Sequence, residues 1–141
     1  MKPAMKVFVC LILAVGVIRF ALTIAGLSDD VVKYASMTVV ILAGAVYFAV
    51  AGRTHKERLK DAYLLILPYM AIEVAALGFT WATGVQTIFH VSEYSFGMSI
   101  GYHTLGHLVG GLTWEPLGLF VVMEAVWAVY TGGGALVRAV R

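Results

Sequence analysis

The chain has 141 residues, of which 61% are hydrophobic and 13% are charged, and its formal net charge is +2. Soluble domains carry about 25% charged residues. A soluble domain this short cannot hide so much apolar surface, because small domains bury the smallest fraction of their chain. The composition therefore excludes a soluble enzyme, a disordered tail and a nucleic-acid-binding module, and it predicts a protein whose main partner is the lipid bilayer.

Long apolar segments divide the chain into four predicted membrane spans. At ~20 residues per span, these are residues 7–27, 31–51, 62–83 and 116–137. We therefore expect an all-α integral membrane protein, a four-transmembrane-helix bundle in which residues 1–141 form a single domain. The first segment also resembles a secretory signal, but Thr23-Ile24-Ala25 is a poor cleavage site, which favours a retained helix.

Basic residues mark one face of this bundle. Lys and Arg number two in the N-terminal tail, four in the charged loop 53–60 and two at the C-terminus, whereas the segment 84–115 has none. By the positive-inside rule, both termini are then cytoplasmic and the 84–115 segment faces outward. The membrane we expect is a bacterial inner membrane.

The outward segment 84–115 contains a further apolar stretch. Residues 96–112 indicate a helix of about 17 residues, the lower limit for crossing a bilayer. A fifth span here would put Arg138 and Arg141 outside, against the charge rule. We expect instead an interfacial or re-entrant helix between spans three and four, buried in the outer mouth of the bundle. Five spans are the alternative.

Three charged residues lie deep inside the predicted spans, namely Arg19, Glu73 and Glu124. Each costs at least ~2.5–3.5 kcal/mol at a helix centre, so none should face lipid. Counted from the outer ends of their spans, all three lie about 12–15 Å deep. One guanidinium can serve two carboxylates, so we expect a buried polar pocket made by this triad. It either fixes helix register or forms a cavity for protons, an ion or a substrate headgroup.

Histidines and glutamates gather in the outward segment. His103 and His107 are one helical turn apart, the spacing by which a helix offers two ligands to one metal, and His90 and Glu93 share a helical face. These four residues predict a divalent metal site, with zinc the simplest choice and iron or copper also compatible. Glu115 would be an extra ligand, or it would hydrogen-bond to one of the ligands and orient it.

Other interpretations of the histidine segment remain open. Small residues beside His103 and His107 would let a haem or a chlorin approach the backbone. The pairs Gly97/Gly101 and Gly106/Gly110 would equally serve close helix packing without any cofactor. Histidine also titrates near neutral pH, so a proton relay is a further alternative.

These features predict a small polytopic membrane protein with a His/Glu metal- or ligand-binding site at its extracytoplasmic mouth, above the Arg/Glu pocket. A catalytic metal there would activate water against a lipid-like substrate, and Arg19 would bind an anionic headgroup. One alternative is a proton- or ion-coupled transporter that acts as a homodimer, with Glu73 and Glu124 as coupling carboxylates. Another is a non-catalytic subunit of a larger membrane complex.

Overall fold

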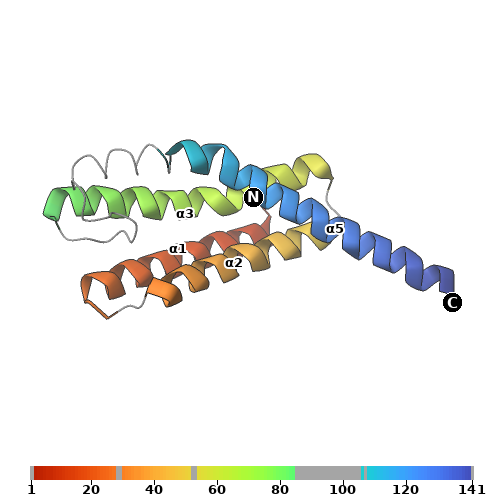
Figure 1. Cartoon of the computed structure of the whole chain (residues 1–141), viewed down its shortest axis with the longest axis horizontal. Coiled ribbons are helices and arrows are strands. Elements are labelled where there is room, and N and C mark those ends of the chain that lie inside the picture. The colour runs from red at the N-terminus through yellow and green to blue at the C-terminus, as the bar shows by residue number, and fades with distance from the viewer. Residues whose placement is uncertain (1, 28–29, 52–53, 85–105, 107, 141) are drawn as a thin grey trace.

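The fold, taken from a computed structural model, is built from helices (Figure 1). The structure describes residues 2–27, 30–51, 54–84, 106 and 108–140. Within these ranges the chain is helical apart from short connections and has no strand, which confirms the all-α class. The long helices are α1 (Pro3–Ile24), α2 (Asp30–Val50), α3 (His55–Thr83) and α5 (Trp114–Val140).

Helices α1 and α3 run parallel to each other, as two ion pairs show. Lys2 Nζ lies 3.6 Å from Glu57 Oε1 near the start of both helices. Further along, Arg19 Nη2 lies 3.7 Å from Glu73 Oε1. The separations along the two helices, 17 and 16 residues, are nearly equal, so the helices stay in step over that whole length.

Helices α2 and α5 run in the opposite direction. Phe8 near the start of α1 packs on Phe48 near the end of α2, with ring centroids 5.7 Å apart. Glu124 of α5 reaches Arg58 in the first turns of α3. Both α2 and α3 contact all the other long helices, whereas α1 and α5 do not contact each other within the part of the chain that the structure describes.

Apolar side chains face outward as well as inward, as a bilayer requires. Three helical stretches are long and apolar enough to cross a membrane, and the described part of α2, Ala35–Val50, is a shorter apolar helix. Helix α3 is the most enclosed of the three. In its most apolar stretch of 18 residues, 39% of the residues are buried, against 17% for α1 and 11% for α5. The three stretches are Pro3–Ile24, His55–Thr83 and Trp114–Ala135, and their length and composition agree with the predicted membrane location.

Helix α3 begins seven residues before the predicted span at 62. Thr54 Oγ1 accepts a hydrogen bond from the Glu57 backbone N–H at 3.3 Å, and Glu57 Oε2 accepts one from the Thr54 N–H at 3.2 Å. This capping box satisfies two N–H groups that a helix start leaves unpaired. Residues 55–61, predicted as part of a charged loop, therefore form the first two turns of α3.

Helix α5 begins beside the middle of α3 rather than at its far end. Just before it, Tyr63 Oη donates a hydrogen bond to the Leu112 carbonyl at 3.3 Å. Beyond Glu124, α5 continues for 16 residues to Val140, about 24 Å of helix, and Figure 1 shows this end projecting past the other helices. Residues 106 and 108–112 are helical, but 96–105 lie outside the described residues, so the predicted helix 96–112 stays a prediction.

Candidate functional site

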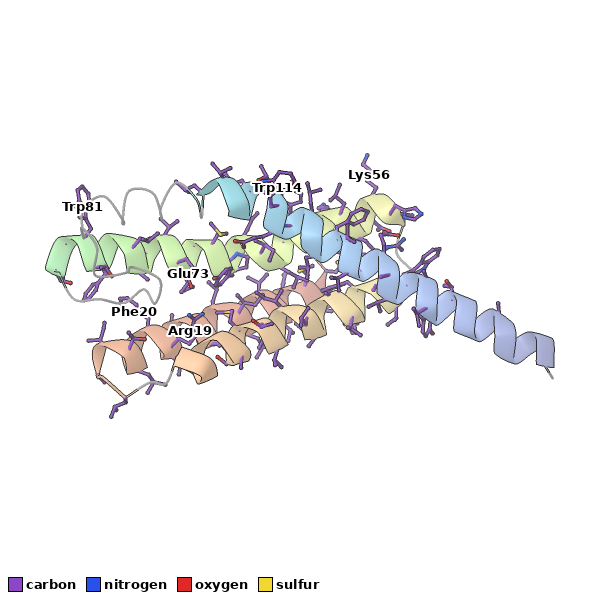
Figure 2. The ribbon with its side chains drawn as sticks, viewed as in Figure 1. Arg19, Phe20, Lys56, Glu73, Trp81 and Trp114 are labelled. Carbon is purple, nitrogen blue, oxygen red and sulfur yellow. The ribbon has the colours of Figure 1, made fainter. Side chains whose placement is uncertain are left out.

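A buried ion pair joins α1 to α3. Arg19 and Glu73 are each only 9% exposed, and their side chains face each other between the two helices (Figure 2). Gly16, one turn before Arg19, allows this close approach, because a Cβ there would lie 2.7 Å from Ile72 Cγ1. The structure thus brings together two members of the predicted triad.

A small cavity lies beside this pair, with a volume of about 20 Å³. A cavity of this size holds about one water molecule when polar groups line it. Arg19, Glu73 and Thr23 supply such groups, and the rest of the wall is made of Gly16, Phe20, Ile72 and Ala76. The ion pair therefore borders a small, partly open space on this side, with room for about one water molecule.

A much larger pocket lies on the other side of Arg19, between α2, α3 and α5. Its volume is about 330 Å³, within the range of small-molecule sites. Most of its lining is apolar, and polar atoms come from the side chains of Arg19, Thr38, Tyr69 and Glu115 and from the indole N–H of Trp114. The remaining lining residues are Met37, Ile41, Leu42, Ile66, Gly118, Leu119 and Val122.

The pocket has an exposed rim on the side of α2 and α5. Leu42 of α2 and Val122 of α5 both line it, and they are 42% and 41% exposed. Trp114, at the start of α5 (Figure 2), lines it too and is exposed. These residues mark a mouth between α2 and α5, on the flank of the bundle. Arg19, which is buried, belongs to the inner wall.

Glu124, the third member of the predicted triad, lies elsewhere. Its carboxylate accepts two hydrogen bonds from Arg58, from Nε at 2.6 Å and from Nη2 at 2.9 Å. Arg58 lies 15 residues before Glu73 on α3, about 22 Å along the axis. The expectation that Glu124 shares a level with Arg19 therefore does not match the structure. That expectation measures the depth of Glu124 from residue 116, which it takes to lie at the outer membrane surface. In the structure, however, α5 begins halfway along α3.

The pair Arg58–Glu124 is part of a larger cluster. The guanidinium carbon of Arg58 lies 4.6 Å from the ring centroid of Trp127, within the range of a cation–π contact. His55 Nδ1 lies 2.8 Å from Glu124 Oε2, although the His55 side chain is 72% exposed. Each helix contributes two residues three positions apart, so both pairs lie on one helical face. That spacing is visible in the sequence, but the sequence analysis places Arg58 in a charged loop and therefore predicts no partner for it on the last span.

The predicted metal ligands His90, Glu93, His103 and His107 all lie outside the described residues. Among the residues that the structure describes, no group of three or more His, Cys, Asp or Glu side chains is placed to hold a metal ion. Glu115, predicted as an extra ligand of that site or as a hydrogen-bond partner of a ligand, lines the large pocket together with Arg19. Thr38 and Tyr69 of the same pocket were not singled out from the sequence, where they read as ordinary residues of apolar spans.

Comparisons with protein-family models, with curated proteins and with solved structures gave no match. A fold by itself does not define a function. The functional assignment therefore depends on the chemistry and geometry of the pocket.

Proposed function

We propose that this chain is a polytopic membrane protein that binds a small hydrophobic ligand, taken from the bilayer, in the pocket between α2, α3 and α5. The observation that carries the proposal is the pocket itself: about 330 Å³ of largely apolar space with a buried arginine in its wall. Ligand sites combine apolar walls with a few convergent polar groups in this way. Ionisable residues inside a membrane are costly and mark functional sites by default.

The lining suggests how a ligand would sit. Its apolar body would contact Met37, Ile41 and Leu119, which belong to the buried core. Its polar end would lie near the polar side-chain atoms of the wall. Because the mouth faces the flank of the bundle, the ligand would enter sideways from the acyl chains rather than from water.

The topology that we propose has four spans with the basic end of the bundle in the cytoplasm of a bacterial inner membrane. The N-terminal ends of α1 and α3 lie together there, as the pair Lys2–Glu57 shows, and Lys56 and Lys60 add positive charge. Cytoplasmic loops carry such an excess of basic residues. Assembly as a homodimer or within a larger membrane complex stays a prediction from the sequence.

Filling the pocket tests this function. A Cβ added at Gly118 meets nothing within 4 Å, and the same holds at Gly132 on the same helix, outside the pocket. Gly118→Leu should therefore occupy the pocket without breaking the fold, and Gly132→Leu is the matched control. The probes are tetraphenylphosphonium and tetraphenylborate, two hydrophobic ions of matched size and opposite charge.

The readout is the thermal unfolding of each variant in lipid nanodiscs of fixed composition. A ligand at 100 times its Kd stabilises the folded state by about 2.7 kcal/mol. We expect at least one ion to stabilise the wild type and Gly132→Leu, and to stabilise Gly118→Leu far less. Partition of the ions into lipid is the same for all variants and cancels. Equal stabilisation of all three proteins would overturn the proposal.

A metal site in the outward segment is a second proposal, supported by three histidines and one glutamate within 18 residues. The ligands would be His90, Glu93, His103 and His107, with zinc the first choice and iron or copper the alternatives. Metal analysis of the purified protein should find about one equivalent, and the double variant His103→Ala/His107→Ala should lose it. A wild-type protein that is folded but contains no metal would contradict the proposed metal site. A haem-type absorption band would instead indicate a bound tetrapyrrole.

A further inference from the structure

The second half of helix α5 extends past the basic end of the bundle. That end is marked by the exposed ion pair of Lys2 with Glu57, at the starts of α1 and α3. Glu124 bonds to Arg58 in the first turn of α3, so α5 reaches this level at Glu124. The 16 residues from there to Val140 add about 24 Å of helix. The headgroup region of a bilayer is only about 5–8 Å thick on each side.

This second half is apolar and uncovered. Residues 125–137 contain no Asp, Glu, Lys or Arg. Residues 128–133 are all exposed, and the exposed fractions of Val129 and Tyr130 are 76% and 61%. If α5 ran on along the membrane normal, most of these side chains would stand in water. Figure 1 shows that α5 instead crosses the other helices obliquely, so that its end points sideways as well as past them.

The polar groups of this segment suit the boundary between acyl chains and headgroups. Thr131 Oγ1 donates a hydrogen bond to the Trp127 carbonyl at 2.8 Å, and a helix satisfies its backbone groups internally, as lipid requires. Trp127 and Tyr130 are of the residue types that gather at the level of the headgroups. Arg138 ends the uncharged run, and a long basic side chain reaches from an apolar segment to the headgroups. These features are typical of a helix that lies in the membrane interface.

Charge favours lipid over a second copy of the chain as the cover of this segment. Four lysines at the basic end of the bundle are exposed, namely Lys2, Lys6, Lys56 and Lys60. Copies in one membrane share one orientation, so a second copy would bring its own basic end against Arg138. Like charges brought together at an interface cost free energy, whereas anionic headgroups attract basic residues near the membrane surface.

We infer that the second half of α5, residues 125–140, is an interfacial helix that docks on the leaflet at the basic end of the bundle and binds anionic phospholipids through Arg138. In the topology that we propose, this is the cytoplasmic leaflet. The chain still returns to the basic end between Thr83 and Glu124, so that topology is unchanged. This surface is separate from the ligand pocket, and neither depends on the other.

The depth of residue 129 in the membrane tests the docking. A nitroxide is attached to Val129→Cys in a Cys10→Ala background, because the native cysteine is exposed. The full chain is placed in nanodiscs of phosphatidylcholine and phosphatidylglycerol, and the collisions of the label with oxygen and with a water-soluble nickel chelate are measured. Val17→Cys, an exposed position on α1, is the lipid reference, and Lys56→Cys, an exposed position at the start of α3, is the water reference.

We expect residue 129 to resemble residue 17, with frequent oxygen collisions and with nickel collisions several times rarer than at residue 56. Nickel collisions as frequent as at residue 56 would place the segment in water and overturn the inference. Rare collisions with both reagents, together with dipolar coupling between two labels, would place the segment against a second copy and overturn it as well.

Lipid preference tests the role of Arg138. A fluorophore on Ala135→Cys, an exposed position three residues before Arg138, is quenched by spin-labelled phosphatidylglycerol or, in a separate sample, by spin-labelled phosphatidylcholine. One basic residue near the surface enriches anionic lipid by about fivefold, so Arg138→Gln should lower the preference for phosphatidylglycerol by about that factor. Lys56→Gln removes one positive charge from the start of α3 instead and should leave the preference almost unchanged.

The outcomes of the two measurements are separable. Equal quenching by the two lipids in the wild type, or a preference that Arg138→Gln does not alter, would overturn the binding of anionic lipid through Arg138. None of these results changes the ligand binding that Gly118→Leu tests, so the interfacial helix and the pocket stand or fall separately.

Discussion

The ion pair that fastens α5 to α3 gives the most quantitative prediction for stability. Arg58 is 1% exposed, and both of its hydrogen bonds to Glu124 are shorter than 3.0 Å. Glu124→Ala removes both charge-assisted bonds and leaves a buried guanidinium without its carboxylate. The Glu124 side chain is 23% exposed and His55 Nδ1 stays 3.0 Å from the guanidinium, so the cost is lower than for a fully buried pair. We expect a loss of about 1.5–3 kcal/mol, the range for hydrogen bonds to a charged group.

The assay is reversible unfolding in mixed micelles, followed by circular dichroism, with Glu57→Gln as the control. Glu57 also pairs with a cation, Lys2, but their side chains are 45% and 59% exposed. An exposed pair contributes under about 1 kcal/mol, and glutamine keeps the capping box. We therefore expect Glu124→Ala to lose several times more stability than Glu57→Gln. Equal losses of stability in the two variants would refute the claim that the Arg58–Glu124 pair holds α5 against α3.

Three further sets of variants test the packing and the capping of the helices. Glu73→Ala should destabilise the protein by about 3–5 kcal/mol, whereas the double variant Arg19→Met/Glu73→Met should recover most of that loss, because apolar residues replace buried ion pairs at little cost; a double variant as unstable as the single one would contradict this. Gly44→Ala should cost about 1–3 kcal/mol, because its Cβ would lie 2.8 Å from the side chain of a fully buried leucine on α3. Gly78→Ala, where a Cβ meets nothing within 4 Å, should be neutral or stabilising by up to about 1 kcal/mol, and the same unfolding assay compares the two. Thr54→Ala should cost about 0.5–2 kcal/mol by removing the cap of α3, whereas Thr54→Ser should keep it; equal melting temperatures would argue against the capping box.

The helices themselves follow closely from the apolar runs in the sequence. The predicted span 31–51 matches α2, Asp30–Val50, to within one residue at each end. The sequence predicts the start of α3 too late, because the charged residues before position 62 indicate a loop. Such residues equally form the first turns of a helix when a cap is present, as Thr54 shows here. The level at which α5 begins was also missed, because counting residues from a loop assumes that every helix starts at the same membrane surface.

The candidate site was only partly predictable. The cost of a charge in lipid led to the pairing of Arg19 with Glu73, which the structure shows. The same reasoning gives Glu124 the wrong partner, because it considers only charges inside the predicted spans and places Arg58 in a charged loop outside them. The pocket itself could not be foreseen, since its volume depends on how far apart α2, α3 and α5 lie, and residues such as Thr38 and Gly118 look like any others on an apolar span.

Photolabelling tests the central claim, that the pocket between α2 and α5 binds a hydrophobic ligand, most directly. A tetraphenylphosphonium derivative that carries a diazirine would be bound in nanodiscs, activated by light and located by peptide mass spectrometry. We predict labelling concentrated at the two lips of the pocket, Thr38 to Leu42 and Gly118 to Val122, that Gly118→Leu suppresses and unlabelled phosphonium displaces. Val17 and Val129 are exposed residues outside the pocket. Labelling that is as strong at these two residues as at the pocket, and that Gly118→Leu does not change, would contradict the account.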